Sequence, residues 1–180
     1  TIEVDEEQTC NPKNPYAESK LLAEKLLEYY AKQHGIEGII FRIFNIYGYY
    51  QNGPFLIPMI INGALKNQKI TLSSPSSVRD YLHLDDLLLL FRLAINYVPK
   101  DKIEIFNVGT GEGTSVGQIV DLITKYLGEE LKVEYTNFRG NETDKIIANV
   151  WKLRKGFHWK PKIPIEEGLK RALNAFKKKN

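Results

Sequence analysis

The sequence predicts an α/β fold, and two observations support this prediction. Segments with the apolar pattern of strands alternate along the chain with segments that have the pattern of helices. Two of the strand segments, residues 39–44 and 103–108, are short and almost continuously apolar, which is typical of parallel strands covered on both faces. Because two such strands are too few for a doubly wound sheet, we expect part of the sheet to belong to sequence outside this chain.

The first helix is predicted to begin at Pro15 and to end near Gly35. Asn14 is a good N-cap residue, and proline suits the first helical position, where its missing N–H has no helical partner. Gly35 suits the left-handed residue that follows a helix. The apolar residues cover more than one stripe, so we expect burial on two sides, one against the sheet and one against the same helix of a second subunit. These apolar residues are Ala17, Leu21, Leu22, Ala23, Leu26, Leu27, Tyr29 and Tyr30.

The remaining elements follow from local signals. Residues 1–13 are polar and predicted to be irregular, and the helical segment 55–65 is expected to be disturbed by Pro58. Asp85 and Asp86 are placed to cap and charge a helix over 87–97, and Ser115 with Gln118 forms a capping-box pattern for a helix to about 127. The other predicted elements are strands 70–72 and 78–82 joined by the turn 73–77, strand 132–135, a short helix from Asn149 to Gly156, and a final helix from 164 to about 177.

Composition excludes several functions. The chain has 180 residues and a net charge of +3 with acidic and basic residues interspersed, which argues against nucleic-acid binding. Cys10 is the single cysteine, so neither a disulfide framework nor a thiolate metal site is expected, which suits a reducing cytoplasm. The three histidines have no metal-ligand spacing, and the longest apolar run, 87–91, is far shorter than the roughly 18 residues of a membrane span. We therefore predict a cytoplasmic protein without a metal, nucleic-acid or membrane partner.

Tyr16 and Lys20 are the candidate catalytic residues. They are four positions apart in the predicted helix, so both side chains lie on one face, one turn apart. A nearby ammonium favours the phenolate and lowers the pKa of a tyrosine, which can then take a proton from a substrate hydroxyl. From the spacing alone, an ordinary exposed tyrosine and lysine would be the better interpretation.

The segment PYAESK, which contains Tyr16 and Lys20, resembles the active-site helix of the extended short-chain dehydrogenase/reductases, specifically the nucleotide-sugar epimerases and dehydratases. Further stretches resemble the same family in the same order along the chain. They are residues 41–48 (FRIFNIYG), 55–58 (FLIP), 79–86 (RDYLHLDD), 106–111 (FNVGTG), 139–142 (RGNE) and 156–161 (GFHWKP). The match at 139–142 is looser, because Gly140 and Asn141 replace Pro-Gly.

The resemblance implies a Rossmann-like NAD(P)-binding fold with a small α/β substrate-binding domain. It implies that residues 1–53 and 83–110 are a remnant of the dinucleotide-binding domain and that 54–82 and 111–180 bind the nucleotide sugar. Tyr16, Lys20 and Phe44 would lie at the cofactor NAD. The substrate contacts would be Asn45, Leu56, Arg79, Tyr81, Arg139 and Glu142. Two arginines from separate loops, Arg79 and Arg139, could clamp a diphosphate with their planar guanidinium groups, although each alone could equally be a surface arginine.

The activity implied is NAD-dependent epimerisation of a UDP- or dTDP-hexose, most similar to UDP-glucose/UDP-galactose 4-epimerase. In this mechanism Tyr16 takes the proton of the sugar C4 hydroxyl, hydride moves from C4 to NAD, and the 4-keto sugar rotates and receives the hydride on its other face. Lys20 keeps Tyr16 acidic and holds the nicotinamide ribose. A dTDP-glucose 4,6-dehydratase-like enzyme is the alternative activity.

The chain departs from the family pattern in two places. The Gly-x-x-Gly-x-x-Gly turn whose amides hold the dinucleotide pyrophosphate is absent, and so is the serine or threonine that precedes the tyrosine helix. The chain also begins at Thr1 rather than at a methionine, which indicates processing, truncation or a fragment. We therefore expect the C-terminal portion of a longer enzyme, with weak or no NAD binding by this chain alone. A non-catalytic nucleotide-sugar-binding or dimerising module is the remaining alternative.

Overall fold

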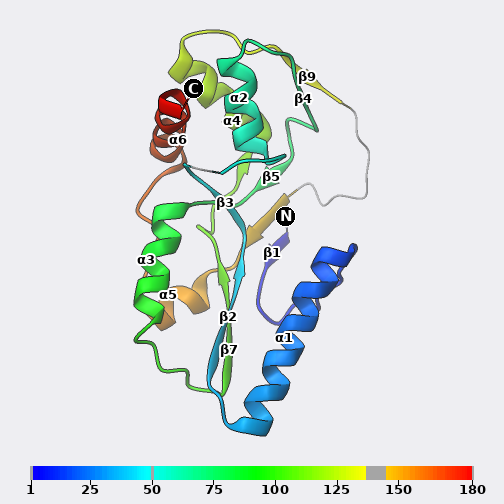
Figure 1. Ribbon diagram of the computed structural model, residues 1–180, viewed down its shortest axis with the longest axis vertical. Coiled ribbons are helices and arrows are strands. Elements are labelled where there is room, and N and C mark those ends of the chain that lie inside the picture. The colour runs from blue at the N-terminus through cyan, green and yellow to red at the C-terminus, as the bar shows by residue number, and fades with distance from the viewer. Residues whose placement is uncertain (1, 50, 137–144, 180) are drawn as a thin grey trace.

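The computed structural model describes residues 2–49, 51–136 and 145–179. The chain forms two lobes that follow one another along its long axis (Figure 1). One lobe is built on strands β2 (Gly38–Ile43) and β7 (Ile103–Val108), and the other on helices α2 (Leu56–Leu65), α4 (Val116–Leu127) and α6 (Ile165–Lys179). The alternation of helices with mainly parallel strands confirms the predicted α/β class.

The first lobe contains the two strands that the apolar runs predict. β2 (Gly38–Ile43) and β7 (Ile103–Val108) pair in parallel, with Gly38 opposite Ile103 and Ile43 opposite Val108. Helix α1 (Pro15–His34) covers one side of this pair, while α3 (Leu84–Ala94) and α5 (Trp151–Phe157) lie on the other (Figure 1). Within the described residues, no strand pairs with the other edge of β2. The expected partial parallel sheet is therefore observed.

The second lobe has its own apolar core. Helices α2 (Leu56–Leu65), α4 (Val116–Leu127) and α6 (Ile165–Lys179) pack together, next to the parallel pair β4 (Ile70–Leu72) and β9 (Val133–Tyr135). Pro58 does not disturb α2, contrary to expectation. It lies in the first turn, where a backbone N–H would have no partner within the helix.

Short strands join the two lobes. The strand expected over 78–82 is instead two strands, β5 (Val78–Arg79) and β6 (Tyr81–His83), interrupted at Asp80. β5 belongs to a four-stranded sheet in the order β1-β10-β5-β8, and β6 pairs in parallel with β3 (Asn45–Tyr47). The other members of the four-stranded sheet are β1 (Ile2–Val4), β10 (Lys145–Ala148) and β8 (Thr114–Ser115). The prediction that residues 1–13 are wholly irregular was wrong, because β1 forms by pairing with the distant β10.

The helix ends test the predicted caps. Asn14 Oδ1 accepts the N–H of Ala17 at 2.8 Å, and Gly35 is left-handed with φ +68°, as predicted for α1. The capping box of Ser115 and Gln118 is also confirmed. Helix α3 begins and ends three residues earlier than the predicted 87–97. It begins earlier because its N-cap is His83, whose Nδ1 accepts the N–H of Asp85 at 3.2 Å. Asp85 and Asp86 are consequently first-turn residues rather than caps.

Among the described residues, helix α1 is covered on one side only. Ala31 is its buried residue, whereas Leu22, Leu26 and Tyr29 are each more than half exposed. Burial of the other side against a second subunit therefore stays a prediction. No described helix is both long and apolar enough to cross a membrane.

Candidate active site

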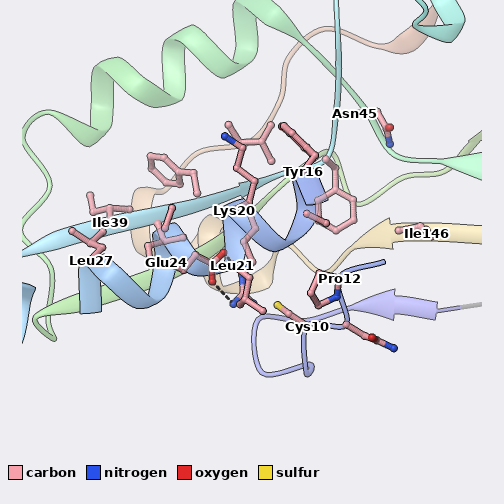
Figure 2. Close-up of a pocket in the computed structure, with 18 of the residues that line it drawn as sticks. Cys10, Pro12, Tyr16, Lys20, Leu21, Glu24, Leu27, Ile39, Asn45 and Ile146 are labelled. Atoms are coloured by element: carbon pink, nitrogen blue, oxygen red, sulfur yellow. Dashed lines mark hydrogen bonds and ion pairs between the residues drawn. The ribbon is translucent and has the colours of Figure 1, made fainter. Parts of the chain in front are cut away.

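An open cleft of about 950 Å³ lies between α1 and β2 and reaches the junction of the two lobes (Figure 2). Its walls come from the segment before α1, from the cleft-facing side of α1, and from β2 and the residues that follow it. Five of the predicted site residues line this cleft together, namely Tyr16, Lys20, Phe44, Asn45 and Arg79. The fold therefore brings into one place residues that are far apart in the sequence, from Tyr16 to Arg79.

Tyr16 and Lys20 are neighbours on the first turns of α1. The Lys20 Nζ atom lies 5.1 Å from the centroid of the Tyr16 ring, which is a cation–π distance. The Tyr16 side chain is 72% exposed, so a molecule in the cleft can reach its hydroxyl group. A positive charge beside an accessible phenol suits proton transfer to or from a substrate hydroxyl.

Asn45 is held at the point where β2 gives way to β3. Both its backbone N–H and its side-chain Nδ2 donate hydrogen bonds to the main-chain oxygen of Asp80, each at 3.1 Å. The carboxamide is exposed at the cleft and fixed in orientation. A carboxamide bound through its Nδ2 atom still has an oxygen that can accept a hydrogen bond.

Arg79 is half-buried at the end of the cleft nearest the second lobe. Its Nη1 atom donates to Ser77 Oγ at 3.1 Å and to the main-chain oxygen of Val78 at 2.9 Å. These contacts hold the guanidinium group at the cleft, where its planar fork suits a phosphate or carboxylate ligand.

The other predicted substrate residues are not in the cleft lining. Leu56 packs against the apolar core of the second lobe. Tyr81 is half-buried, its ring lies edge-on to Tyr47 with centroids 6.4 Å apart, and burial raises the pKa of Tyr81 to about 12. Arg139 and Glu142 lie outside the described residues.

The pair Glu24 and Arg42 is a feature of the cleft that the sequence analysis missed. Arg42 Nε and Nη2 donate to the two carboxylate oxygens of Glu24 at 3.0 and 2.8 Å, and Nη1 donates to the main-chain oxygen of Glu6 at 2.9 Å. The hydrogen bonds that Arg42 donates to Glu24 raise the pKa of Arg42 above its ordinary value. The signal in the sequence was a single charged residue inside an otherwise apolar strand.

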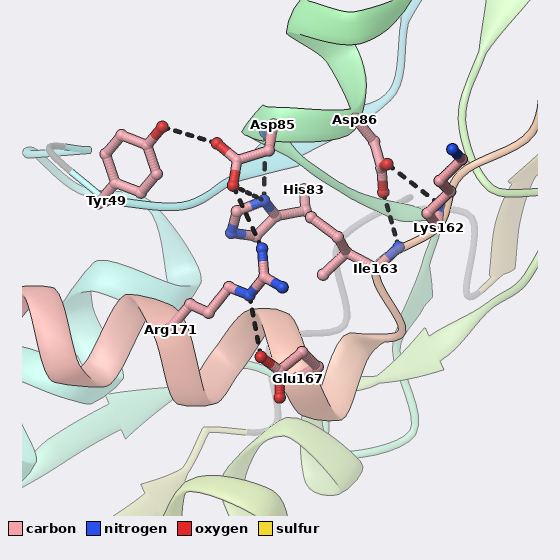
Figure 3. Close-up of polar contacts among 8 residues, drawn as sticks. All are labelled: Tyr49, His83, Asp85, Asp86, Lys162, Ile163, Glu167 and Arg171. Carbon is pink, nitrogen blue, oxygen red and sulfur yellow. Dashed lines mark hydrogen bonds and ion pairs between the residues drawn. The ribbon is translucent and has the colours of Figure 1, made fainter.

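A second polar cluster ties α3 to α6, away from the cleft (Figure 3). Asp85 accepts the Tyr49 hydroxyl at 2.6 Å and lies 3.5 Å from Arg171 Nη1, while Arg171 Nε donates to Glu167 at 2.9 Å. Burial lowers the pKa of His83, in agreement with the interpretation of this histidine as a packed, hydrogen-bonded residue near a helix start. Among the residues that the structure describes, no group of three or more potential ligands could hold a metal ion.

The chain resembles known enzymes along nearly its whole length. The sequence profile of the family described as GDP-mannose 4,6 dehydratase matches residues 1–172. UDP-glucose 4-epimerase of Lactobacillus helveticus is 30% identical over 89% of this chain and 54% of its own length. The solved structure of Thermotoga maritima UDP-glucose 4-epimerase with UDP-glucose superposes with a TM-score of 0.91 at 28% identity, over 99% of this chain and 58% of that one. The solved structure of Bacillus anthracis dTDP-glucose 4,6-dehydratase with NAD superposes with a TM-score of 0.88 at 28% identity, over 99% of this chain and 56% of that one. The chain thus spans little more than half the length of these relatives.

Proposed function

The chain belongs to the family of GDP-mannose 4,6 dehydratase, and from this membership we propose that it forms the substrate-binding and proton-transferring portion of an NAD-dependent nucleotide-sugar 4-epimerase. The relatives named above include UDP-glucose 4-epimerases, which supports UDP-glucose or UDP-galactose as the substrate. The observation that carries the proposal is the Tyr16–Lys20 pair in a cleft that also contains Asn45 and Arg79.

The residues of the cleft have distinct proposed roles. Tyr16 takes the proton of the sugar C4 hydroxyl and returns it at the end of the reaction, and Lys20 stabilises the intervening phenolate by its charge. Arg79 and Asn45 hold the diphosphate of the substrate, together with Arg139. Leu56, Tyr81 and Glu142 complete the proposed contacts with the nucleotide sugar, as extensions of the site beyond the described cleft.

The fit of this chain to NAD is partial. Tyr16, Lys20 and Phe44 are positioned at the cleft where they suit the nicotinamide-ribose end of the cofactor. The glycine-rich turn 109–113 does not provide a pyrophosphate cradle, since a side chain at Gly109 or Gly113 would meet atoms already packed against the backbone. NAD bound to the complete protein would supply hydride acceptance and return. The chain itself would contribute the proton transfer and the substrate contacts.

Two further features belong to the proposal. Residues 1–53 and 83–110 would form part of the dinucleotide domain, and 54–82 and 111–180 the substrate domain. The two apolar cores support this division only in part, because α5 and Trp159 pack in the core of the first lobe. The exposed apolar side of α1 would make a homodimer interface with the same helix of a second subunit. The residues on that side are Leu22, Leu26, Tyr29 and Tyr30.

Calorimetric titration of the chain with UDP-glucose tests the substrate site. We expect binding, and we expect Arg79→Ala to weaken it by at least about tenfold, because one charge-assisted contact to phosphate is lost. Arg92→Ala, which removes an exposed arginine of α3 outside the cleft, is the matched control and should bind normally. Equal effects of the two substitutions, or no binding by the unmodified chain, would contradict the proposed site.

A dehydratase is the second candidate, supported by the family description and by the dTDP-glucose 4,6-dehydratase neighbour. The two activities differ in their product, because an epimerase returns an isomer of the substrate and a dehydratase releases water to leave a 4-keto-6-deoxy sugar. Assay of the complete protein with UDP-glucose and dTDP-glucose distinguishes them, with two readouts. Loss of the mass of one water identifies the dehydratase, and chromatographic separation of the two epimers, which have equal mass, identifies the epimerase. Substrate binding with no turnover of either sugar would favour a non-catalytic binding module.

A further inference from the structure

Asp80 is buried at the junction of the two lobes, and the site described above gives it no role. It lies between β5 and β6, and none of its side chain is exposed to solvent. A carboxylate is costly to bury unless hydrogen bonds replace its lost water. The contacts that compensate for this cost show what the residue holds in place.

The Asp80 carboxylate gathers two segments that are distant in the sequence. Oδ1 accepts the backbone N–H of Thr110 at 2.8 Å and the Thr110 hydroxyl at 2.7 Å. Oδ2 accepts the N–H of Gly111 at 2.9 Å and that of Ala148, at the end of β10, at 3.3 Å. One side chain therefore fixes the turn that follows β7 and the end of β10.

The same turn is packed directly against this carboxylate. A Cβ atom at Gly109 would lie 2.5 Å from Asp80 Oδ2 and 2.9 Å from Ala148 Cβ, so the close approach requires glycine at this position. The same turn is also held by Arg154, whose Nη2 atom donates to the main-chain oxygen of Thr110 at 2.9 Å. Asp80 is thus confined by the turn that follows β7 and by the end of β10, and α5 holds that turn through Arg154.

The main chain of Asp80 connects this anchor to the cleft. Its carbonyl oxygen accepts both hydrogen bonds that orient Asn45, and its preceding neighbour is Arg79. A shift of the backbone at Asp80 would move the acceptor of Asn45 and the base of the Arg79 side chain together. These are the two described residues proposed to hold the diphosphate.

We infer that Asp80 is a positioning residue for the diphosphate site. By anchoring its own backbone through the 109–111 turn and β10, it sets the orientation of Asn45 and Arg79 without touching the substrate. The inference deepens the proposed function and rests on it, but its structural part, the control of Asn45, can be measured without any ligand.

Asp86 offers a matched control of the same chemistry. It is also a buried aspartate, and its carboxylate accepts the backbone N–H groups of Lys162 and Ile163 at 3.0 and 2.9 Å. It does not line the cleft and is not bonded to Asn45 or Arg79. Asp80→Asn and Asp86→Asn each place an amide NH₂ against backbone donors, so both should lower stability, and only the first should disturb the site.

The experiment measures three quantities in the unmodified chain and in both variants. They are the urea midpoint, the hydrogen-exchange rate of the Asn45 backbone amide, and the dissociation constant for UDP-glucose. We expect Asp80→Asn to speed Asn45 exchange and to weaken UDP-glucose binding, each by at least about tenfold, the equivalent of one hydrogen bond. Asp86→Asn should lower the urea midpoint by a comparable amount. It should leave the Asn45 exchange rate and the dissociation constant for UDP-glucose within about twofold of their values in the unmodified chain.

The outcomes separate this inference from the proposed function. If the unmodified chain does not bind UDP-glucose, the proposed function fails, and Asn45 exchange still tests the link to Asp80. Unchanged Asn45 exchange in Asp80→Asn, or equal changes in both variants, would overturn the inference and assign Asp80 a purely structural role.

A milder pair of variants covers the case in which Asp80→Asn does not fold. Thr110→Val removes the hydroxyl that donates to Asp80 Oδ1, and Thr136→Val removes a hydroxyl that donates to the main-chain oxygen of Leu72 at 3.1 Å, away from the site. Faster Asn45 exchange in the first and not in the second supports the inference. The same exchange rate in both contradicts it.

Discussion

Arg42 and Glu24 form a two-pronged ion pair that joins β2 to α1 across the wall of the cleft. Both nitrogen–oxygen distances are 3.0 Å or shorter, and both side chains are mostly buried. A partly buried guanidinium with a bidentate carboxylate partner is stabilising in this geometry and costly to break from one side only. The pair therefore sets the spacing between the helix that carries Tyr16 and the strand that leads to Asn45.

We predict that Glu24→Gln lowers the free energy of unfolding by about 1–3 kcal/mol, because Arg42 loses its charged partner while remaining partly buried. Urea unfolding measures this change. Glu28→Gln is the control on the same helix, since its 3.0 Å partner Lys25 is largely exposed, and its effect should stay below about 0.5 kcal/mol. Equal effects of the two substitutions would show that the Glu24–Arg42 pair adds no stability beyond that of a surface pair.

Gly168 on α6 packs against Tyr47. From this contact we predict that substitutions at the two positions have coupled effects on the free energy of unfolding. A Cβ atom at position 168 would overlap the Tyr47 hydroxyl and lie 2.7 Å from its Cζ atom. Gly168→Ala should therefore lower the free energy of unfolding by about 2 kcal/mol. Tyr47→Phe should be close to neutral alone, since the buried hydroxyl has no hydrogen-bond partner among the described residues.

The double variant of these two positions checks the steric explanation. Removal of the Tyr47 hydroxyl frees part of the space that the alanine needs, so the double variant should be more stable than Gly168→Ala alone. Strictly additive effects in a urea double-mutant cycle would contradict direct contact as the cause.

His83 predicts a pH dependence of stability. Burial lowers its pKa below the ordinary value of 6.5, so between these two values the unfolded chain binds more protons than the folded chain. The free energy of unfolding should therefore fall as the pH drops through about 6.5 toward the folded-state pKa. Protonation of Nδ1 would also remove the acceptor that caps α3.

Urea unfolding at about pH 7.5 and 5.5 measures this effect. His83→Asn keeps a side-chain oxygen for the cap and removes the titration, so its stability should change less over this interval than that of the unmodified chain. Glu167 accepts a hydrogen bond from Arg171, which lowers the pKa of its carboxyl below the ordinary value of 4.5. Titration of Glu167 therefore does not contribute to the change between about pH 5.5 and 7.5. An equally steep fall in the variant would exclude His83 as the cause.

Helix α1 predicts self-association of this chain. Its outer apolar side is exposed, and apolar patches of this kind commonly mark interfaces. Leu26→Glu should convert the expected dimer to a monomer, as judged by light scattering across a concentration series. Leu88→Glu, which changes a half-exposed leucine of α3, is the control and should remain dimeric. A chain that is monomeric before substitution would contradict the proposed interface.

We predict that substitution of Tyr16 in the complete protein lowers activity without lowering stability. Tyr16→Phe removes the proton-transfer group from a largely exposed side chain, so kcat should fall by about 10²–10⁴-fold while the urea midpoint stays unchanged. Tyr29→Phe, on the outer side of the same helix, should retain full activity. Comparable kcat values for the two variants would remove Tyr16 from the mechanism.

The sequence by itself determined the features that depend on neighbouring residues. Asn14, Pro15 and Gly35 specify the ends of α1 because capping involves residues within one helical turn. Helical periodicity then places Lys20 beside Tyr16, and the apolar runs specify β2 and β7.

Only the tertiary structure decided the features that depend on distant segments. β1 and β10 are too short to be recognised from their own residues, and they exist because each pairs with a strand far away in the sequence. The sequence predicts Asp80 inside a strand over 78–82, but the fold interrupts the strand at this residue, buries it and surrounds it with donors from positions 110, 111 and 148. Local sequence patterns therefore specify the helix that carries Tyr16 and Lys20. Long-range hydrogen bonds to Asp80 position Asn45 and Arg79, because a buried charge finds its partners only in the folded chain.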